Sequence, residues 1–173
     1  MVRYSQVLLA ILLTASLPGA VFADGFFAAS YGSVFGGGSP ATTGSYALAI
    51  GGTGAHGIGA ELEFSDTRNF FQTSGGEKFG RVLTLMPSIF VEAPISRVKP
   101  YGIFGFGFIV QRTGSDDDLF STLSDEEIGY SAGAGVTFQI SPRFGVRGDF
   151  RHFKVRQSDG LSFQRMMFGV VIG

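Results

Sequence analysis

Residues 128–140, IGYSAGAGVTFQI, decide the class of fold. Counting from Ile128, every second residue is apolar or aromatic, and the residues between are glycine, serine, threonine and glutamine. A period of two is typical of a β-strand, because successive side chains point to opposite faces. The stretch therefore predicts one long strand with an apolar face and a face of small and polar residues.

The same period recurs on both sides of this stretch, and no window shows the 3.6-residue period of an amphipathic helix. Turn residues divide the pattern into eight segments: 26–35, 45–52, 56–65, 79–92, 101–111, 128–140, 144–155 and 163–172. Pro87 lies inside the fourth segment. Because proline cannot donate a ladder hydrogen bond, we expect a bulge or break there. The sequence predicts an all-β protein.

The connections between segments alternate in length. Residues 53–55, 93–98 and 141–143 form short turns, whereas the connections that begin at 36, 66 and 116 are long or polar. This asymmetry is typical of a membrane barrel with short periplasmic turns and longer outer loops.

A soluble sandwich also alternates, so the pattern alone leaves that alternative open. Segments of about ten residues match the nine to eleven that a tilted strand needs to cross a bilayer, and exceed the usual five or six. Lipid offers no partner to an open strand edge, so the sheet must close. We therefore expect an eight-stranded antiparallel transmembrane β-barrel. Tyr31, Tyr46, Tyr101 and Tyr130 could form its aromatic girdles, or could simply be sheet formers.

Charged residues occupy the polar face of two segments that should lie on opposite walls of the barrel. They form the predicted lumen charge cluster: Glu61, Glu63, Arg147, Asp149 and Arg151. Eight strands leave an interior that side chains can fill, and unpaired charges there would be costly. We expect pairing, helped by Arg81 or Arg165, and hence a lumen plugged by charged side chains that conducts ions poorly. The alternative is that the charged residues of one of the two segments lie at the aqueous rim and never meet those of the other.

Residues 1–23 have the pattern of a secretory signal peptide. Arg3 precedes the apolar run Val7–Leu17, and Val21-Phe22-Ala23 offers a cleavage site. The alternative is a membrane anchor helix, but the run is shorter than the ~20 residues that a bilayer requires. We expect cleavage after Ala23 and a barrel domain over residues 24–173.

The composition excludes several classes of function. Of the 13 basic residues, Arg3 lies in the leader, which leaves 12 against 14 acidic residues. No basic patch predicts nucleic-acid binding. There is no cysteine, hence no disulfide framework and no thiolate metal site. No cofactor is expected.

Three stretches together resemble a known family: Lys99–Phe108 (KPYGIFGFGF), Gly129–Phe138 (GYSAGAGVTF) and Ser141–Phe153 (SPRFGVRGDFRHF). They look like the second half of the small porin-like outer-membrane β-barrels, similar to the transmembrane domain of outer membrane protein A and to opacity-type barrels. The resemblance implies location in the cell outer membrane, with both termini on the periplasmic side. It also implies outer-membrane lipid and lipopolysaccharide as partners, and the barrel-assembly machinery during insertion.

One departure from the family concerns the final residues. Such barrels usually end in an aromatic residue, whereas this sequence ends in Phe168-Gly-Val-Val-Ile-Gly173. Either the assembly signal differs or the end is truncated.

Two stretches could carry chemistry. Some barrels of this kind are lipid A deacylases with a serine two residues after a histidine, but Lys154 follows His152 at that spacing, and Ser158 lies six residues on. Residues 116–118 and 125–127 are acidic and could bind a divalent cation, but their spacing does not match an EF-hand loop and is typical of a solvated outer loop. The sequence therefore favours a non-enzymatic structural or interaction protein that displays surface loops. The alternatives are a lipid A-modifying enzyme and a narrow, low-conductance pore.

Overall fold

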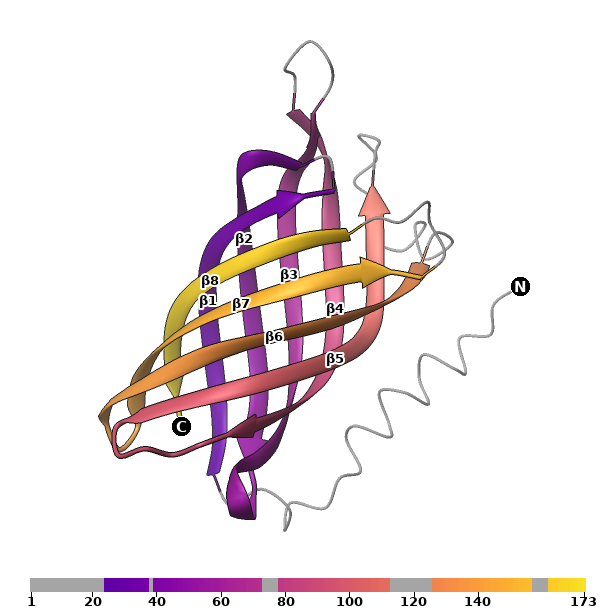
Figure 1. The fold of residues 1–173 in the computed structure, drawn as a ribbon. Coiled ribbons are helices and arrows are strands. Elements are labelled where there is room, and N and C mark those ends of the chain that lie inside the picture. The colour runs from indigo at the N-terminus through magenta and orange to yellow at the C-terminus, as the bar shows by residue number, and fades with distance from the viewer. Residues whose placement is uncertain (1–23, 38, 73–77, 113–125, 157–161) are drawn as a thin grey trace.

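The eight strands form a closed antiparallel barrel in which each strand pairs with its neighbours in sequence and β8 pairs with β1 (Figure 1). The computed structural model describes residues 24–37, 39–72, 78–112, 126–156 and 162–173. The strands are β1 (Asp24–Gly36), β2 (Ser39–Thr53), β3 (Ile58–Gln72), β4 (Lys78–Glu92), β5 (Val98–Arg112), β6 (Glu126–Ser141), β7 (Phe144–Val155) and β8 (Ser162–Ile172). The predicted architecture is confirmed. In the described part of the chain, no helix is long and apolar enough to span a membrane.

One end of the barrel carries the short connections. Residues 54–57, which include the 3-10 turn η1 (Ala55–Gly57), join β2 to β3, and residues 93–97 and 142–143 make the other two turns. β1 begins and β8 ends at this same end (Figure 1). It is therefore the end that the family resemblance assigns to the periplasm, and the opposite end is called the outer end below.

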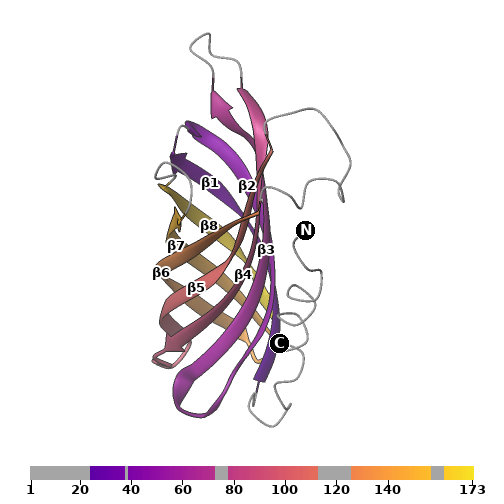
Figure 2. The ribbon, with the colours of Figure 1, turned by 90° about the vertical axis from the view of Figure 1, so that its right-hand side faces the viewer.

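The strands reach further toward the outer end than the sequence predicted. β3 runs to Gln72, through residues expected to begin a loop, and β2 begins at Ser39, so the first connection is short rather than long. His56 lies in η1 rather than in a strand. The strands wind obliquely around the barrel and rise to different heights (Figure 2).

The two faces predicted for residues 128–140 are present in the structure. On β6, Ala132 and Ala134 face outward and are exposed, whereas Ser131 is buried in the lumen. Large apolar side chains such as Leu48 and Phe106 are half exposed on the outer wall. In a water-soluble protein such a surface would be a liability, but in a bilayer it is the surface that lipid covers.

The irregularity expected at Pro87 is present as a break in the ladder between β4 and β5. Leu85 pairs with Phe108 and Ser88 with Gly105 in one unchanged register, and the pairing is interrupted between them. The missing proline N–H thus leaves a gap in the ladder without a bulge.

One prediction about the aromatic residues was wrong. Tyr31, Tyr46 and Tyr130 face outward as a girdle requires, and the rings of Tyr31 and Tyr46 lie 4.9 Å apart. Tyr101 instead points into the lumen, where it is 7% exposed. Its role there is hydrogen bonding, as described below.

Candidate functional site

The charged residues predicted to meet in the lumen do meet. β3 contributes Glu61 and Glu63 from one wall, and β7 contributes Arg147, Asp149 and Arg151 from the other. Because side chains alternate along a strand, the two-residue spacing places every one of them inside. Their side chains are at most 7% exposed.

Arg147 forms the periplasmic edge of this network. Its Nη1 and Nη2 donate to the two carboxylate oxygens of Glu61, at 2.8 and 3.3 Å. Its Nε donates to the Tyr101 hydroxyl at 2.5 Å, and that hydroxyl donates to Asp149 Oδ2 at 3.2 Å. The Arg147 guanidinium also lies 4.6 Å from the centre of the Tyr101 ring, a cation–π distance.

Arg151 is the centre of the network and is fully buried. Its Nη2 lies 2.8 Å from Glu61 Oε1 and 3.3 Å from Glu63 Oε2, and its Nε lies 3.2 Å from Asp149 Oδ1. One guanidinium thus contacts all three lumen carboxylates. Removal of this side chain would leave several buried negative charges with weakened compensation.

Arg165 on β8 completes the charge balance. Its Nη2 donates to Glu63 Oε1 at 2.5 Å, and its guanidinium lies 4.8 Å from the centre of the Phe153 ring. Of the two residues expected to add compensation, Arg165 enters the lumen. Arg81 does not: it pairs with Asp66 at 2.7 Å on the outer wall. The network therefore holds three arginines and three carboxylates, and is electrically neutral.

Apolar side chains fill the lumen on the outer side of the network. The cluster comprises Val34, Phe70, Val82, Met86, Ile109, Phe153, Val155 and Phe163, each at most 2% exposed. The rings of Phe153 and Phe163 stack at 4.8 Å, and Phe70 meets Phe163 edge-on at 5.2 Å. We call this cluster the apolar layer. This layer was not predicted from the sequence, because a polar lumen was expected.

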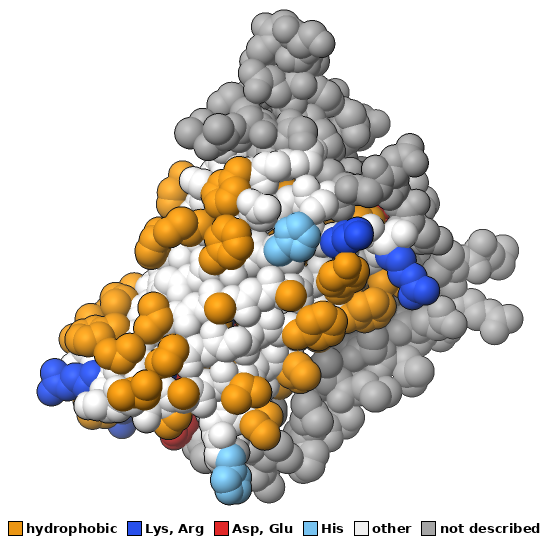
Figure 3. Space-filling view, viewed as in Figure 1, with side chains coloured by type: hydrophobic (Ala, Val, Ile, Leu, Met, Phe, Trp, Pro, Cys, Tyr) orange, Lys and Arg blue, Asp and Glu red, His pale blue; other side chains and the backbone are white. Residues whose placement is uncertain are grey.

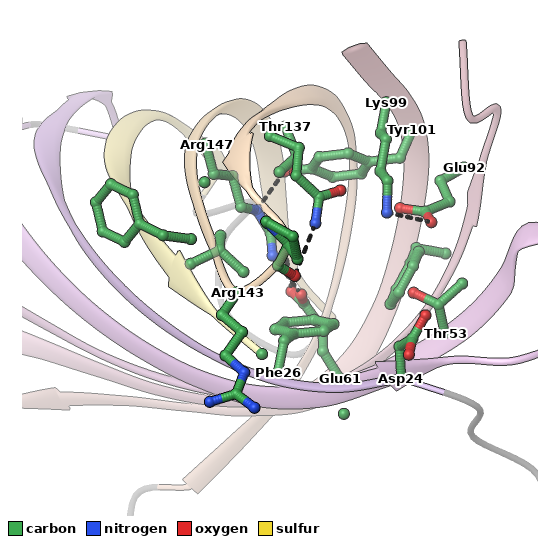
Figure 4. A pocket seen from close by; sticks show the side chains of 18 residues that line it. Asp24, Phe26, Thr53, Glu61, Glu92, Lys99, Tyr101, Thr137, Arg143 and Arg147 are labelled. Carbon is green, nitrogen blue, oxygen red and sulfur yellow. Dashed lines mark hydrogen bonds and ion pairs between the residues drawn. The ribbon is translucent and has the colours of Figure 1, made fainter. Parts of the chain in front are cut away.

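On the periplasmic side of the network the lumen opens into a cavity of about 150 Å³ (Figure 4). Glu61, Arg147 and Tyr101 lie at its inner end. An ion pair between Lys99 and Glu92, with Nζ 3.8 Å from Oε1, also lines it. Residues of the charge network therefore form part of the lining of this cavity.

The outer wall brings together a pair of residues that sequence reasoning missed. Ser162 Oγ on β8 lies 3.2 Å from His152 Nε2 on β7. Ser158, which the sequence places six residues after His152, lies outside the described residues, as does the acidic stretch 116–118. Within the described ranges no carboxylate contacts His152, and no group of three metal-ligating side chains occurs. Among the described residues, the pair thus has no acidic third member to orient a catalytic histidine.

The geometry and the sequence now identify the family. A sequence profile described as "Outer membrane protein beta-barrel domain" matches residues 9–172. The chain belongs to this family. Membership places it in the outer membrane and agrees with the closed eight-stranded architecture. Comparison with curated protein sequences gives no match.

Solved structures of other outer-membrane barrels share the fold. Neisserial surface protein A matches with a TM-score of 0.67 at 16% identity, covering 86% of this chain and 94% of that one. Outer membrane protein H of Pseudomonas aeruginosa matches with a TM-score of 0.59 at 19% identity, covering 87% and 99%. The outer membrane enzyme PagL matches with a TM-score of 0.52 at 14% identity, covering 85% and 98%. At these identities the likeness concerns the fold alone, and this fold carries both an enzyme and other proteins.

Proposed function

We propose that this protein is a closed, non-conducting outer-membrane barrel that anchors surface segments, and that its lumen is sealed twice. The observation that carries the proposal is the contact of Arg151 with carboxylates from the opposite wall. Long side chains from β3 and β7 bridge the lumen at this level, and we infer that they close the aqueous path.

The charge layer opposes ion flow for an electrostatic reason. An ion that crosses it must break a hydrogen-bonded contact such as Arg147–Glu61, with both partners buried. Breaking a buried pair costs about 3–5 kcal/mol. Because the network is neutral, it also offers no net charge to attract an ion of either sign.

The apolar layer is a second barrier with a different physical basis. The stacked rings of Phe153 and Phe163 and the edge-on Phe70 offer no polar partner to a hydrated ion. The buried hydroxyls on the neighbouring walls already bond to one another, Ser65 with Thr84 and Thr67 with Ser45. An ion there would have to shed water, which is costly without replacement hydrogen bonds. Either layer alone is therefore expected to block conduction.

The surface role follows from connectivity. Residues 73–77, 113–125 and 157–161 join strands at the outer end, opposite the short turns. The segment 113–125 is the longest and contains Asp116-Asp117-Asp118. A rigid barrel that holds such segments at the cell surface is suited to display rather than transport.

We infer that the alternative of a lipid A-modifying enzyme is disfavoured, because the His152–Ser162 pair has no acidic partner among the described residues. The test is mass spectrometry of lipid A acyl chains from cells with and without the protein. An unchanged acyl pattern supports the proposal, and loss of an acyl chain that Ser162→Ala abolishes would refute it.

Planar-bilayer recording tests the closed barrel. The parent protein should show no steady channel. Arg147→Ala/Arg151→Ala opens the charge layer but leaves the apolar layer, and Phe153→Ala/Phe163→Ala does the reverse, so each double variant should conduct weakly at most. The combined quadruple variant should conduct well. Steady, large conductance by the parent would overturn the proposal.

A further inference from the structure

On the outer wall, the outward-facing positions of the bilayer-spanning band that the structure describes hold uncharged residues such as Leu62, Phe104, Ala134, Phe150 and Phe168. Among outward-facing residues whose side chains the structure describes, charge occurs in two places: Asp66, Arg68 and Arg81 on β3–β4, and Lys154 and Arg156 at the end of β7 and just beyond it. Both places lie where the apolar wall gives way to the outer connections.

The first of these clusters neutralises most of its own charge. Arg81 donates to both oxygens of Asp66, from Nε at 2.7 Å and from Nη2 at 2.8 Å. Arg68 Nε contacts the same carboxylate at 3.4 Å. The anion that these arginines require is therefore supplied mainly by the protein.

The second cluster has cations for which the described residues supply no such anion. Lys154 and Arg156 are exposed, and neither forms an ion pair with a carboxylate of the described chain. Across the strands, Lys154 faces Tyr130 on β6 and Ser162 on β8.

Neutral hydrogen-bonding groups surround these cations. Gln164 lies opposite His152, which is hydrogen-bonded to Ser162. We call this set the β7–β8 basic patch: His152, Lys154, Arg156, Ser162 and Gln164. Figure 3 shows a histidine and two basic side chains gathered at the outer ends of the front strands, with hydrophobic side chains beside and below them.

We propose that the β7–β8 basic patch binds the phosphate group of a phosphorylated outer-leaflet lipid. The chemistry of the patch specifies the group: ammonium and guanidinium cations, with hydroxyl and amide donors beside them, are the partners that phosphate oxygens take. The position specifies the source. The patch adjoins the lipid-facing wall, so a ligand there can place an anion on Lys154 and Arg156 and acyl chains along Phe150 and Met166 below them. Lipopolysaccharide carries both parts.

The apolar neighbours distinguish this ligand from a soluble anion. Met166 is 44% exposed and Phe150 is 46% exposed, and Phe150 packs on Phe35 with ring centres 6.2 Å apart. A free phosphate would gain nothing from this surface, whereas a lipid gains both charge neutralisation and apolar contact.

Titration in detergent micelles, read by native mass spectrometry of the folded barrel, tests the proposal. The probes are bis-phosphorylated lipid A and the same lipid after removal of its phosphates. The parent should bind the phosphorylated form more tightly by about tenfold or more, because two cations gain an anionic partner only from that form. Lys154→Gln/Arg156→Gln should remove that preference, and Ser162→Ala should reduce it.

Arg68→Gln is the matched control, because it removes an exposed outer-wall cation whose carboxylate is already held by Arg81. It should change the affinity by less than about twofold. A heat-induced mobility shift on gels confirms that each variant is folded. Equal binding of the two lipids by the parent would overturn the proposal. So would an equal loss in Arg68→Gln, or full displacement of the lipid by inorganic phosphate.

Discussion

Glu61 and Arg147 face each other across the barrel interior, from β3 and β7, with a carboxylate oxygen 2.8 Å from Nη1. Glu61 accepts from Arg151 as well, at 2.8 Å. One carboxylate therefore compensates two buried arginines.

Replacing Glu61 with Gln should be strongly destabilising. The variant keeps the shape but leaves two buried guanidinium groups with less negative charge, and breaking a buried pair costs about 3–5 kcal/mol. Urea unfolding in phosphatidylcholine vesicles measures the change. Glu92→Gln is the control, because the Glu92–Lys99 pair is longer and partly exposed, and should cost about 1 kcal/mol or less. Equal costs for the two variants would contradict a desolvated network.

Tyr101→Phe should cost about 1–3 kcal/mol, since it removes the acceptor of Arg147 Nε and a donor to Asp149 in a buried site. Tyr130→Phe removes the same hydroxyl from the outer wall, where the ring stacks on Phe104 at 6.4 Å, and should change stability by about 0.5 kcal/mol or less. The same vesicle assay compares the two. If Tyr130→Phe were the more damaging, the inward role of Tyr101 would be refuted.

Ala134→Arg should destabilise the barrel in lipid by about 2–4 kcal/mol if the site is near the bilayer midplane, because the side chain points into hydrocarbon. Gly133→Ala, one residue away, should fail by crowding instead: a Cβ there would lie 2.8 Å from Arg151 Cγ and closer still to the Phe150 carbonyl oxygen. A thinner bilayer should reduce the loss of stability in Ala134→Arg but not in Gly133→Ala. Ala134→Arg unfolding like the parent would show that residue 134 does not face lipid.

The protein isolated from cell envelopes should begin at Asp24, since Val21-Phe22-Ala23 forms the expected cleavage site. N-terminal sequencing of the membrane-embedded protein gives the answer, and a retained Met1 would contradict it.

Periodicity made the fold and both faces predictable, because a period of two fixes inside and outside for a whole strand once one residue is placed. The same rule could have placed Tyr101 correctly. Phe104 and Phe106 face outward, so position 101, an odd number of residues away, must face the lumen. Tyr101 was assigned to the girdle because it is a tyrosine, although the period of two along the strand placed it inside.

Other features depend on register, which the sequence does not reveal. Ser162 reaches His152 because Lys154 pairs with Ser162, and this pairing is set when β7 and β8 dock. The apolar layer was missed for a different reason. Phe153 and Phe163 alternate in phase with the lumen charges, but a membrane barrel was expected to have a polar interior throughout.

The lumen network also bears on how the barrel comes together. Glu61 and Arg151 are 90 residues apart in the chain, and Glu63 and Arg165 are 102 apart. Bridges of this span cannot form in a single hairpin, nor in a growing sheet whose far walls have not yet met. These ion pairs therefore stabilise only the closed barrel, and they form late in folding. Contacts this distant in sequence slow folding, but they also make the closed state and a partly open one differ sharply in energy. A barrel whose opposite walls are joined by buried ion pairs should therefore close, and later unfold, in one cooperative step.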